Sequence, residues 1–440
     1  MAGLRRALGA LDATMVNVGV MIGSAVFLVA SDVARSLPDP LLQLGAWVVA
    51  ALFSLAGALT IAELGAAMPE AGGLYVYLRR AFGPFWGFLY GWSLFAVIQT
   101  AAIAAVAVAF ASYCGHFVPL SAGGIQLVAT TAIVFFTCLN ILGIREGVVT
   151  QNIVTFAKIA VVLGVVVLAF VGGAGSWSNL AAPPSDRPIG LVAVAASLIG
   201  PLAAYDGWIT ISYMGGEVKR PERNLPIAAL ASVAIVAALY LALNAAYLIV
   251  LGPGRVAASQ LVASDTARAL IGARGADLAA AMVIIATVGG LHGNILAGAR
   301  VLYAMAAEGL FWRPAAQVHP RLQTPAVALA AQGVVSVAFV FTGRFDQLLT
   351  SFLFASWLFY GLGGLAVFVL RRDPALQRPY RVPGYPIVPA LFVLFAALLL
   401  VGTIAADPRD SLLGGALLLT GVPAYLLFAS ASRRTIQQRE

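Results

Sequence analysis

Long apolar runs separated by short polar segments make up almost the whole chain. The run from Ala81 to Ile144 contains no Asp, Glu, Lys or Arg, which leaves room for two apolar helices divided near Pro119. A bilayer core of about 30 Å needs roughly 20 apolar residues per helix. The same analysis of the other runs predicts about twelve membrane helices. Their expected centres are Ile22, Leu52, Val97, Val134, Val162, Ala203, Tyr240, Val288, Val334, Tyr360, Val393 and Leu418.

No segment is left over for a soluble domain. The pattern therefore predicts an all-α integral membrane protein with a single transmembrane domain over residues 1–440. The first apolar run, Ala13 to Ser31, exceeds a signal-peptide core of about 7–15 residues and is expected to remain as a helix. Composition agrees, because apolar residues make up 61% and charged residues only 10%. Soluble proteins carry roughly 25% charged residues.

Composition and motifs exclude several other classes of protein. The net charge of +8 comes from basic residues scattered between apolar runs, which argues against nucleic-acid binding. Two cysteines and three histidines are too few for a disulfide scaffold or most Cys/His metal sites, and we expect no metal or cofactor. The sequence has no HExxH, CxxC, GxSxG or Walker motif, which argues against a membrane enzyme. It also has no repeated pore loop of the kind that channels use.

The distribution of basic residues orients the predicted helices. An even number of helices puts both termini on one side of the membrane, and 18 of the 26 Lys and Arg residues fall on that side. The positive-inside rule then predicts cytoplasmic N and C termini in a multi-pass protein of the cell (inner) membrane. Lys158 falls within a membrane helix. The remaining seven are Arg35, Arg187, Arg255, Arg268, Arg274, Arg344 and Arg409.

Ionisable residues at membrane depth are costly and are therefore functional candidates. Lys158, Asp206 and His292 lie within predicted helices. For His292 we expect a neutral imidazole that hydrogen-bonds to a neighbouring helix. Asp206 could bind a ligand, or it could cap the end of a broken helix. Glu63 and Arg300 fall near cytoplasmic helix ends, where snorkelling to the membrane surface would explain them.

Two helices contain residues that favour an interruption at mid-depth. The first has Gly19, Gly23 and Ser24 within seven residues, and the sixth has Pro201 followed by Gly207. Either feature alone is explained by close helix packing. Interruptions at corresponding positions of two repeats, however, indicate the midplane site of a transporter. Broken ends expose N–H groups that suit a carboxylate and C=O groups that suit an ammonium, so the predicted ligand is a zwitterion such as an amino acid.

Motifs along nearly the whole chain resemble one transporter family. They are Val18-Gly-Val-Met-Ile-Gly-Ser-Ala-Val-Phe27, Ala62-Glu-Leu-Gly65, Pro69-Glu-Ala-Gly-Gly-Leu-Tyr-Val-Tyr77, Phe82-Gly-Pro84, Ala204-Tyr-Asp-Gly-Trp208, Gly216-Glu-Val-Lys-Arg-Pro-Glu-Arg-Asn-Leu-Pro226, His319-Pro320, Thr324-Pro325 and Arg378-Pro-Tyr-Arg-Val-Pro383. Their order and spacing resemble the amino acid–polyamine–organocation (APC) superfamily, and within it the L-type amino acid transporter family.

The resemblance implies a fold and an activity. It implies a LeuT-like 5+5 inverted repeat with helices 1 and 6 unwound, comprising residues 10–175 and 190–370, followed by helices 11 and 12 in 386–431. It also implies a secondary transporter, not an enzyme, that exchanges neutral L-amino acids by alternating access without sodium. The alternatives left open are a proton-coupled amino acid permease, a cationic amino acid or polyamine permease, and a non-transporting amino acid sensor.

The resemblance also implies roles for particular residues. The substrate carboxylate would meet the backbone N–H groups of Gly23, Ser24 and Ala25, and the α-amino group would meet carbonyls of Met21, Ala203 and Asp206. The substrate-binding set predicted from the motifs is Met21, Gly23, Ser24, Ala25, Ala203, Ala204 and Asp206. Lys158 on helix 5 resembles the lysine that replaces a sodium ion between helices 1 and 8. Burial could instead make it a proton carrier.

The chain departs from the family pattern at three places. Ala25 stands where the family usually has glycine, and its methyl group could narrow the carboxylate pocket. Ala203 replaces a bulky aromatic that gates the outer side in many animal relatives. The stretch 115–124 has no cysteine, so no disulfide-linked heavy subunit is expected, and Cys114 is expected to be a buried small residue.

Overall fold

The computed structural model describes residues 4–181, 189–342, 345–406 and 408–437. Regular structure in these residues is helical, apart from two isolated bridges that join Leu8 to Val218 and Ala71 to Met214. Arg187, Arg344 and Arg439, which entered the predicted charge distribution, lie outside the described residues.

The first part of the chain forms nine α-helices and one π-helical turn. The bounds are α1 Ala10–Met21, α2 Ala25–Leu28, α3 Ala30–Ser36, α4 Pro40–Ala67, α5 Leu74–Phe82, α6 Pro84–Ser93, α7 Gln99–Cys114, α8 Ala122–Leu142 and α9 Ile144–Val171, with the π-helical turn Leu94–Ile98 joining α6 to α7. Local chemistry explains where some of them begin. At α4, for example, Asp39 accepts the N–H groups of Leu41 and Leu42 at 2.7 and 3.2 Å, and Pro40 occupies the first helical position.

The second part of the chain contributes α10 to α17, and three further helices follow. The bounds are α10 Leu191–Ala204, α11 Thr210–Tyr213, α12 Pro221–Leu251, α13 Pro253–Ala258, α14 Val262–Ile271, α15 Gly275–Ala307, α16 Ala326–Val340, α17 Phe345–Leu370, α18 Ile387–Ala406, α19 Pro408–Leu419 and α20 Gly421–Gln437. Short 3-10 turns lie at Trp177–Asn179, Gly215–Glu217, Gly272–Arg274 and Arg313–Ala316.

Eight helical stretches of the described residues are long and apolar enough to cross a membrane. They are Pro40–Ala67, Pro84–Cys114, Ala122–Leu142, Ile144–Val171, Pro221–Leu251, Val262–Ala307, Ile387–Ala405 and Ser411–Ser430. Four shorter apolar helices are Ala10–Met21, Ala193–Ala204, Ala326–Val340 and Phe354–Leu370. The predicted all-helical, multi-span architecture is confirmed. The number twelve and the repeat boundaries stay predictions.

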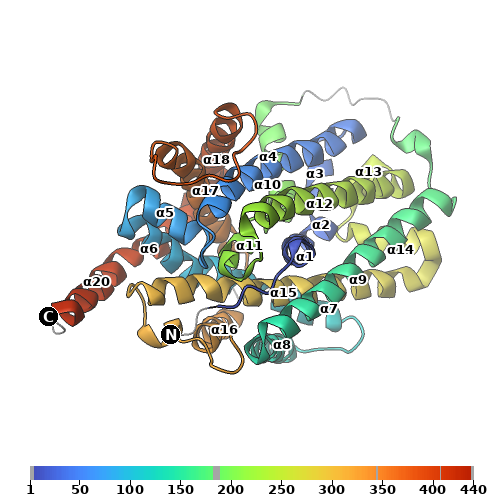
Figure 1. Ribbon diagram of the computed structural model, residues 1–440. Coiled ribbons are helices and arrows are strands. Elements are labelled where there is room, and N and C mark those ends of the chain that lie inside the picture. The colour runs from blue at the N-terminus through green and yellow to red at the C-terminus, as the bar shows by residue number, and fades with distance from the viewer. Residues whose placement is uncertain (1–3, 182–188, 343–344, 407, 438–440) are drawn as a thin grey trace.

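α1 lies in the middle of the bundle, where it packs against α9, α12 and α15 (Figure 1). α12 also packs along α4, and α17 and α18 pack together beside α5 and α6 (Figure 1). The segment that precedes α1 and the helix α20 both extend toward the left end of the bundle in Figure 1. A central α1 means that any interruption in it lies among other helices and not at the lipid boundary.

The prediction that Glu63 and Arg300 snorkel to the membrane surface is wrong. Arg300 and Glu217 are both fully buried and form a two-pronged ion pair, with N···O distances of 3.0 and 3.1 Å. Glu63 is buried as well and accepts hydrogen bonds from Arg371 and from the backbone N–H of Val382. The partners lie 83 and 308 residues away along the chain, so chain folding, not the membrane surface, neutralises these charges.

Charged pairs also hold the segment that follows α17 against neighbouring helices. The hydrogen-bonded carboxylate of Glu63 raises the pKa of the Arg371 guanidinium, which also lies over the ring of Tyr385. In the same loop, the hydrogen bond from Arg80 lowers the pKa of Asp373. These contacts tie the segment between α17 and α18 to α4 and α5.

Replacement of Arg300 tests the buried pair. In Arg300→Gln the Glu217 carboxylate keeps its burial and loses its cation, so we expect a loss of about 3–5 kcal/mol in stability. Thermal midpoints of the detergent-purified protein would measure the loss. The double variant Glu217→Gln/Arg300→Gln should recover part of it, while Arg321→Gln, an exposed control, should change little. A double variant less stable than the single one would contradict this account.

Candidate functional site

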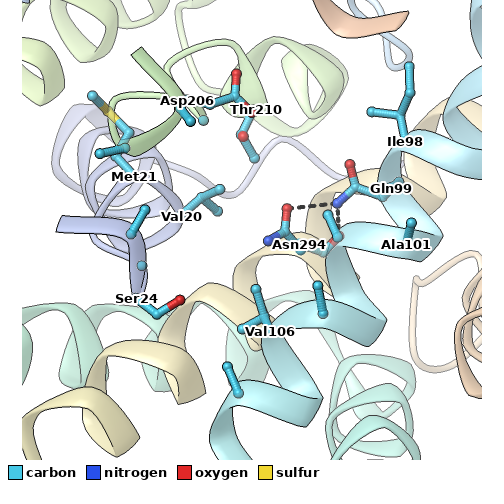
Figure 2. Close-up of a pocket in the computed structure, with 18 of the residues that line it drawn as sticks. Val20, Met21, Ser24, Ile98, Gln99, Ala101, Val106, Asp206, Thr210 and Asn294 are labelled. Atoms are coloured by element: carbon cyan, nitrogen blue, oxygen red, sulfur yellow. Dashed lines mark hydrogen bonds between the residues drawn. The ribbon is translucent and has the colours of Figure 1, made fainter. Parts of the chain in front are cut away.

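A cavity of about 480 Å³ lies between α1, α7 and the α10–α11 region. In Figure 2, Val20, Met21 and Ser24 lie on one side of this space, and Gln99 and Val106 of α7 lie on the other. Asn294 of α15 and Tyr360 of α17 complete the wall. The volume is within the range of roughly 300–1,000 Å³ typical of small-molecule pockets.

One wall of the cavity is the interruption between α1 and α2. α1 ends at Met21 and α2 begins at Ala25, so Ile22 to Ser24 are not helical. The Gly23 N–H donates a hydrogen bond to the Met21 carbonyl at 2.8 Å. Within the described part of the chain, the N–H groups of Ser24 and Ala25 have no acceptor. The break therefore presents unpaired donors beside the cavity, as an interrupted helix should.

A second wall is the interruption between α10 and α11. α10 contains Pro201 and ends at Ala204, and α11 begins at Thr210. Between them Gly207 has φ +115°, a conformation that favours glycine. A β-carbon there would lie 2.8 Å from Val20 Cγ1 and 3.1 Å from the Met21 nitrogen. Only glycine therefore lets the two breaks approach this closely.

Tyr240 and Asn17 connect the two breaks. The buried Tyr240 hydroxyl lies 2.7 Å from the Met21 carbonyl oxygen and 3.1 Å from that of Ala204. The Asn17 side chain donates to the Trp208 carbonyl and accepts from the Ile211 N–H, both at 2.8 Å. Neither residue was among those predicted from the sequence. For Asn17, the signal was an amide within an apolar run.

All seven residues of the predicted substrate-binding set line the cavity: Met21, Gly23, Ser24, Ala25, Ala203, Ala204 and Asp206. Their local environments differ. The Met21 carbonyl already accepts from Tyr240 and Gly23, and the Ala203 carbonyl accepts from the Asp206 N–H at 3.3 Å. The structure therefore brings the set together, and its contact with a substrate stays a prediction.

Lys158 is absent from the cavity wall and lies behind the first break. Its buried ammonium donates to the Gly19 and Ile22 carbonyls at 2.6 and 2.7 Å. Its side chain crosses α15 at Gly289, where a β-carbon would come within 2.5 Å of Lys158 Cε. Lys158 thus pairs carbonyls of the interrupted α1 from α9 and packs against α15.

Polar side chains that sequence analysis missed also face the cavity. The Gln99 amide donates to the backbone and side-chain oxygens of Asn294 at 3.0 and 2.8 Å (Figure 2). The Tyr360 hydroxyl donates to Asp206 Oδ1 at 2.9 Å, and Thr210 lies nearby in the wall. Isolated amides and hydroxyls in apolar helices are common, so only their convergence distinguishes them.

The other predicted polar and cysteine residues lie apart from the cavity wall. His292 forms the expected hydrogen bond to a neighbouring helix, with its Nδ1 2.8 Å from Gln151 Oε1. Cys114, expected to be buried, is only half-buried at the end of α7, and Cys138 is exposed. The described residues contain no group of three His, Cys, Asp or Glu side chains that could hold a metal ion.

Comparisons with known proteins find similar sequences over nearly the whole chain. A family model described as amino acid permease matches residues 8–427. The chain is 32% identical to the serine/threonine exchanger SteT of Bacillus subtilis (strain 168), over 96% of this chain and 97% of the relative. It is 30% identical to the human b(0,+)-type amino acid transporter 1, covering 97% and 88%. It is also 30% identical to the human large neutral amino acids transporter small subunit 2, covering 96% and 80%.

Proposed function

The chain belongs to the amino acid permease family of the APC superfamily, and from this premise we propose that it exchanges neutral L-amino acids across the cell membrane without sodium. Its relatives are transporters, and the chain is not an enzyme. The observation that carries the proposal is the cavity, where two helix interruptions and all seven predicted binding residues meet.

The fold that this function needs is the LeuT-like arrangement. We assign residues 10–175 and 190–370 to two inverted five-helix repeats, residues 386–431 to two peripheral helices, and the unwound segments to the breaks after Met21 and Ala204. Eight long and four shorter apolar helices are consistent with twelve spans. The segment preceding α1 and the helix α20 lie at one end of the bundle, which is consistent with two cytoplasmic termini.

The substrate would lie with its charged ends between the two breaks. Its carboxylate would accept from the Ser24 and Ala25 N–H groups, because the Gly23 N–H is already engaged with Met21. The Ser24 hydroxyl is close by. Its ammonium would donate to carbonyls of the second break, where Asp206 also supplies a carboxylate. Binding through the Gly23 N–H or the Met21 carbonyl would require their present hydrogen bond to open.

The chemistry of the wall supports a neutral side chain. No Lys, Arg or His is among the described residues that line the cavity, and Asp206 is its only carboxylate. An acidic substrate side chain would find no cation there to compensate its desolvation. α7 presents Ala101, Ala102 and Ala105 toward the same space, leaving room for an apolar or small polar side chain.

Alternating access would operate by closing this site from either side in turn. Lys158 would act as a fixed charge that ties α1 to α9 and α15, in the place of a sodium ion. The chain would work without a disulfide-linked heavy subunit, since residues 115–124 contain no cysteine.

Competition by substrate analogues tests the zwitterion site. A neutral L-amino acid, small ones included, should compete for uptake into proteoliposomes loaded with amino acid. Its amide and its decarboxylated amine should bind at least about tenfold more weakly, because each loses hydrogen bonds to a charged group worth roughly 1.5–3 kcal/mol. Equal competition by the amine would exclude this site. Binding without any exchange of labelled substrate would favour the sensor alternative.

Asp206→Asn separates substrate binding from helix capping. If the carboxylate pairs with the substrate ammonium or with a cationic side chain, affinity should fall by about tenfold or more, and any cationic substrate should be lost first. Capping alone predicts little change in stability for Asp206→Asn, because asparagine caps a helix about as well as aspartate, and a loss of about 0.5–2 kcal/mol for Asp206→Ala, with unchanged relative affinities in Asp206→Asn. Tyr360→Phe is the matched control, since it removes the hydrogen bond to Asp206 and leaves its charge in place.

Lys158→Ala tests whether the Lys158 ammonium takes the place of a sodium ion. Without the ammonium, the Gly19 and Ile22 carbonyls at the break lose their tie to α9, so exchange should slow by about tenfold or more while equilibrium affinity changes less. Phe156→Ala, a change at an exposed position of the same helix, should leave both unchanged. Strong stimulation of the unmodified protein by sodium, or normal exchange by Lys158→Ala, would contradict the fixed-charge role. Flux that follows a proton gradient and is lost in Lys158→Ala would favour the proton-coupled alternative.

A further inference from the structure

A cluster of basic residues lies where the start of the chain meets the segment before α12, away from the cavity. We propose that this basic cluster, which consists of Arg5, Arg6, Lys219, Arg220 and Arg223, binds the phosphate-bearing headgroup of an anionic phospholipid. A bound headgroup holds the N-terminal segment against the start of α12. The proposal does not depend on the identity of the transported substrate.

Backbone hydrogen bonds join the two segments that carry the cluster. The N–H groups of Ala7 and Leu8 donate to the Glu217 carbonyl at 2.9 and 3.0 Å, and the Lys219 N–H donates to the Leu8 carbonyl at 2.9 Å. The bridge between Leu8 and Val218 is parallel, so the two arginines precede it on one segment and the basic residues after Val218 follow it on the adjoining segment. A single headgroup with several phosphate oxygens can draw on both.

The positive charge of the cluster is only partly balanced. All five side chains belong to exposed residues, and none forms an ion pair with another described residue. Glu217 is buried and forms an ion pair with Arg300. Asp12 accepts hydrogen bonds from the Gly9 N–H and the Asn152 amide. Glu70 and Glu222 are the exposed acids on the neighbouring segments, so five cations face two carboxylates. Such a site attracts an anion.

Exposed apolar side chains adjoin both halves of the cluster. Ile227 and Leu230 follow Arg223 by four and seven residues, on the same face of α12, and are 39% and 50% exposed. Leu11 of α1 follows the two arginines and is 57% exposed. The cluster thus lies at the end of apolar surfaces that can hold acyl chains. It also lies on the side predicted to be cytoplasmic, where juxtamembrane basic residues meet anionic lipids. This geometry favours a lipid over a free anion.

Charge-matched variants test the site. Arg6→Gln/Lys219→Gln/Arg223→Gln removes three charges of the cluster and keeps Arg220, whose φ is +43°. The control is Arg313→Gln/Arg321→Gln/Arg381→Gln. It removes three exposed arginines on the same predicted side of the membrane, and none of these forms an ion pair with another described residue. The full chain is placed in nanodiscs of phosphatidylcholine, with or without phosphatidylglycerol, and amide hydrogen exchange is followed at Ala7 and Leu8.

Phosphatidylglycerol should slow this exchange about tenfold in the unmodified protein and in the control variant, but less than about twofold in the cluster variant. High salt should reduce the slowing in the unmodified protein, because it screens the exposed charges. Equal slowing in both variants would overturn the proposal. So would the same slowing by inorganic phosphate in phosphatidylcholine discs, which would indicate a free-anion site. If the triple variant fails to fold, Arg6→Gln alone should lose part of the bound phosphatidylglycerol counted by native mass spectrometry. An unchanged count would equally refute the site.

Discussion

The structure depends on how backbone polar groups are satisfied where α1 and α10 end in the middle of the helix bundle. Hydrocarbon offers no hydrogen bonds, so an interrupted helix is tolerated only where protein or an aqueous cavity supplies the missing partners. The two breaks meet this requirement differently on their two sides. Lys158, Tyr240 and Asn17 pair some of the backbone groups near the breaks, while the N–H groups of Ser24 and Ala25 beside the cavity have no acceptor among the described residues.

Because some backbone groups near the breaks are paired and others are not, this part of the structure can be rigid and still bind a ligand. Carbonyls of α1 are held from α9 by an ammonium and from α12 by a phenol, which fixes where the break lies. The close approach at Gly207 then brings the second break alongside the first. The remaining unpaired donors are preorganised, so a ligand that pairs them need not rearrange the surrounding helices.

Buried charges elsewhere in the protein likewise need partners from the protein. Glu63 and Glu217 are buried carboxylates, and each is paired with an arginine from a distant segment. Breaking such a pair is costly because the remaining charge stays in a poorly solvated site. These pairs hold together the end of the bundle where the chain starts. The exposed basic cluster beside them forms no ion pair with the residues that the structure describes, and is open to an external anion.

The sequence by itself determined the helical membrane fold and seven residues of the cavity wall, because both depend on local features. Apolar run length predicts helices, and the glycine, serine and proline residues near Gly23 and Pro201 predict the interruptions. Only the tertiary structure decided which polar groups meet. Tyr240, Gln99 and Asn294 lie in ordinary apolar helices, and the partner of Glu63 is 308 residues away. The sequence could not show these contacts, because a hydrogen bond between distant segments leaves no local pattern and exists only once the helices have packed.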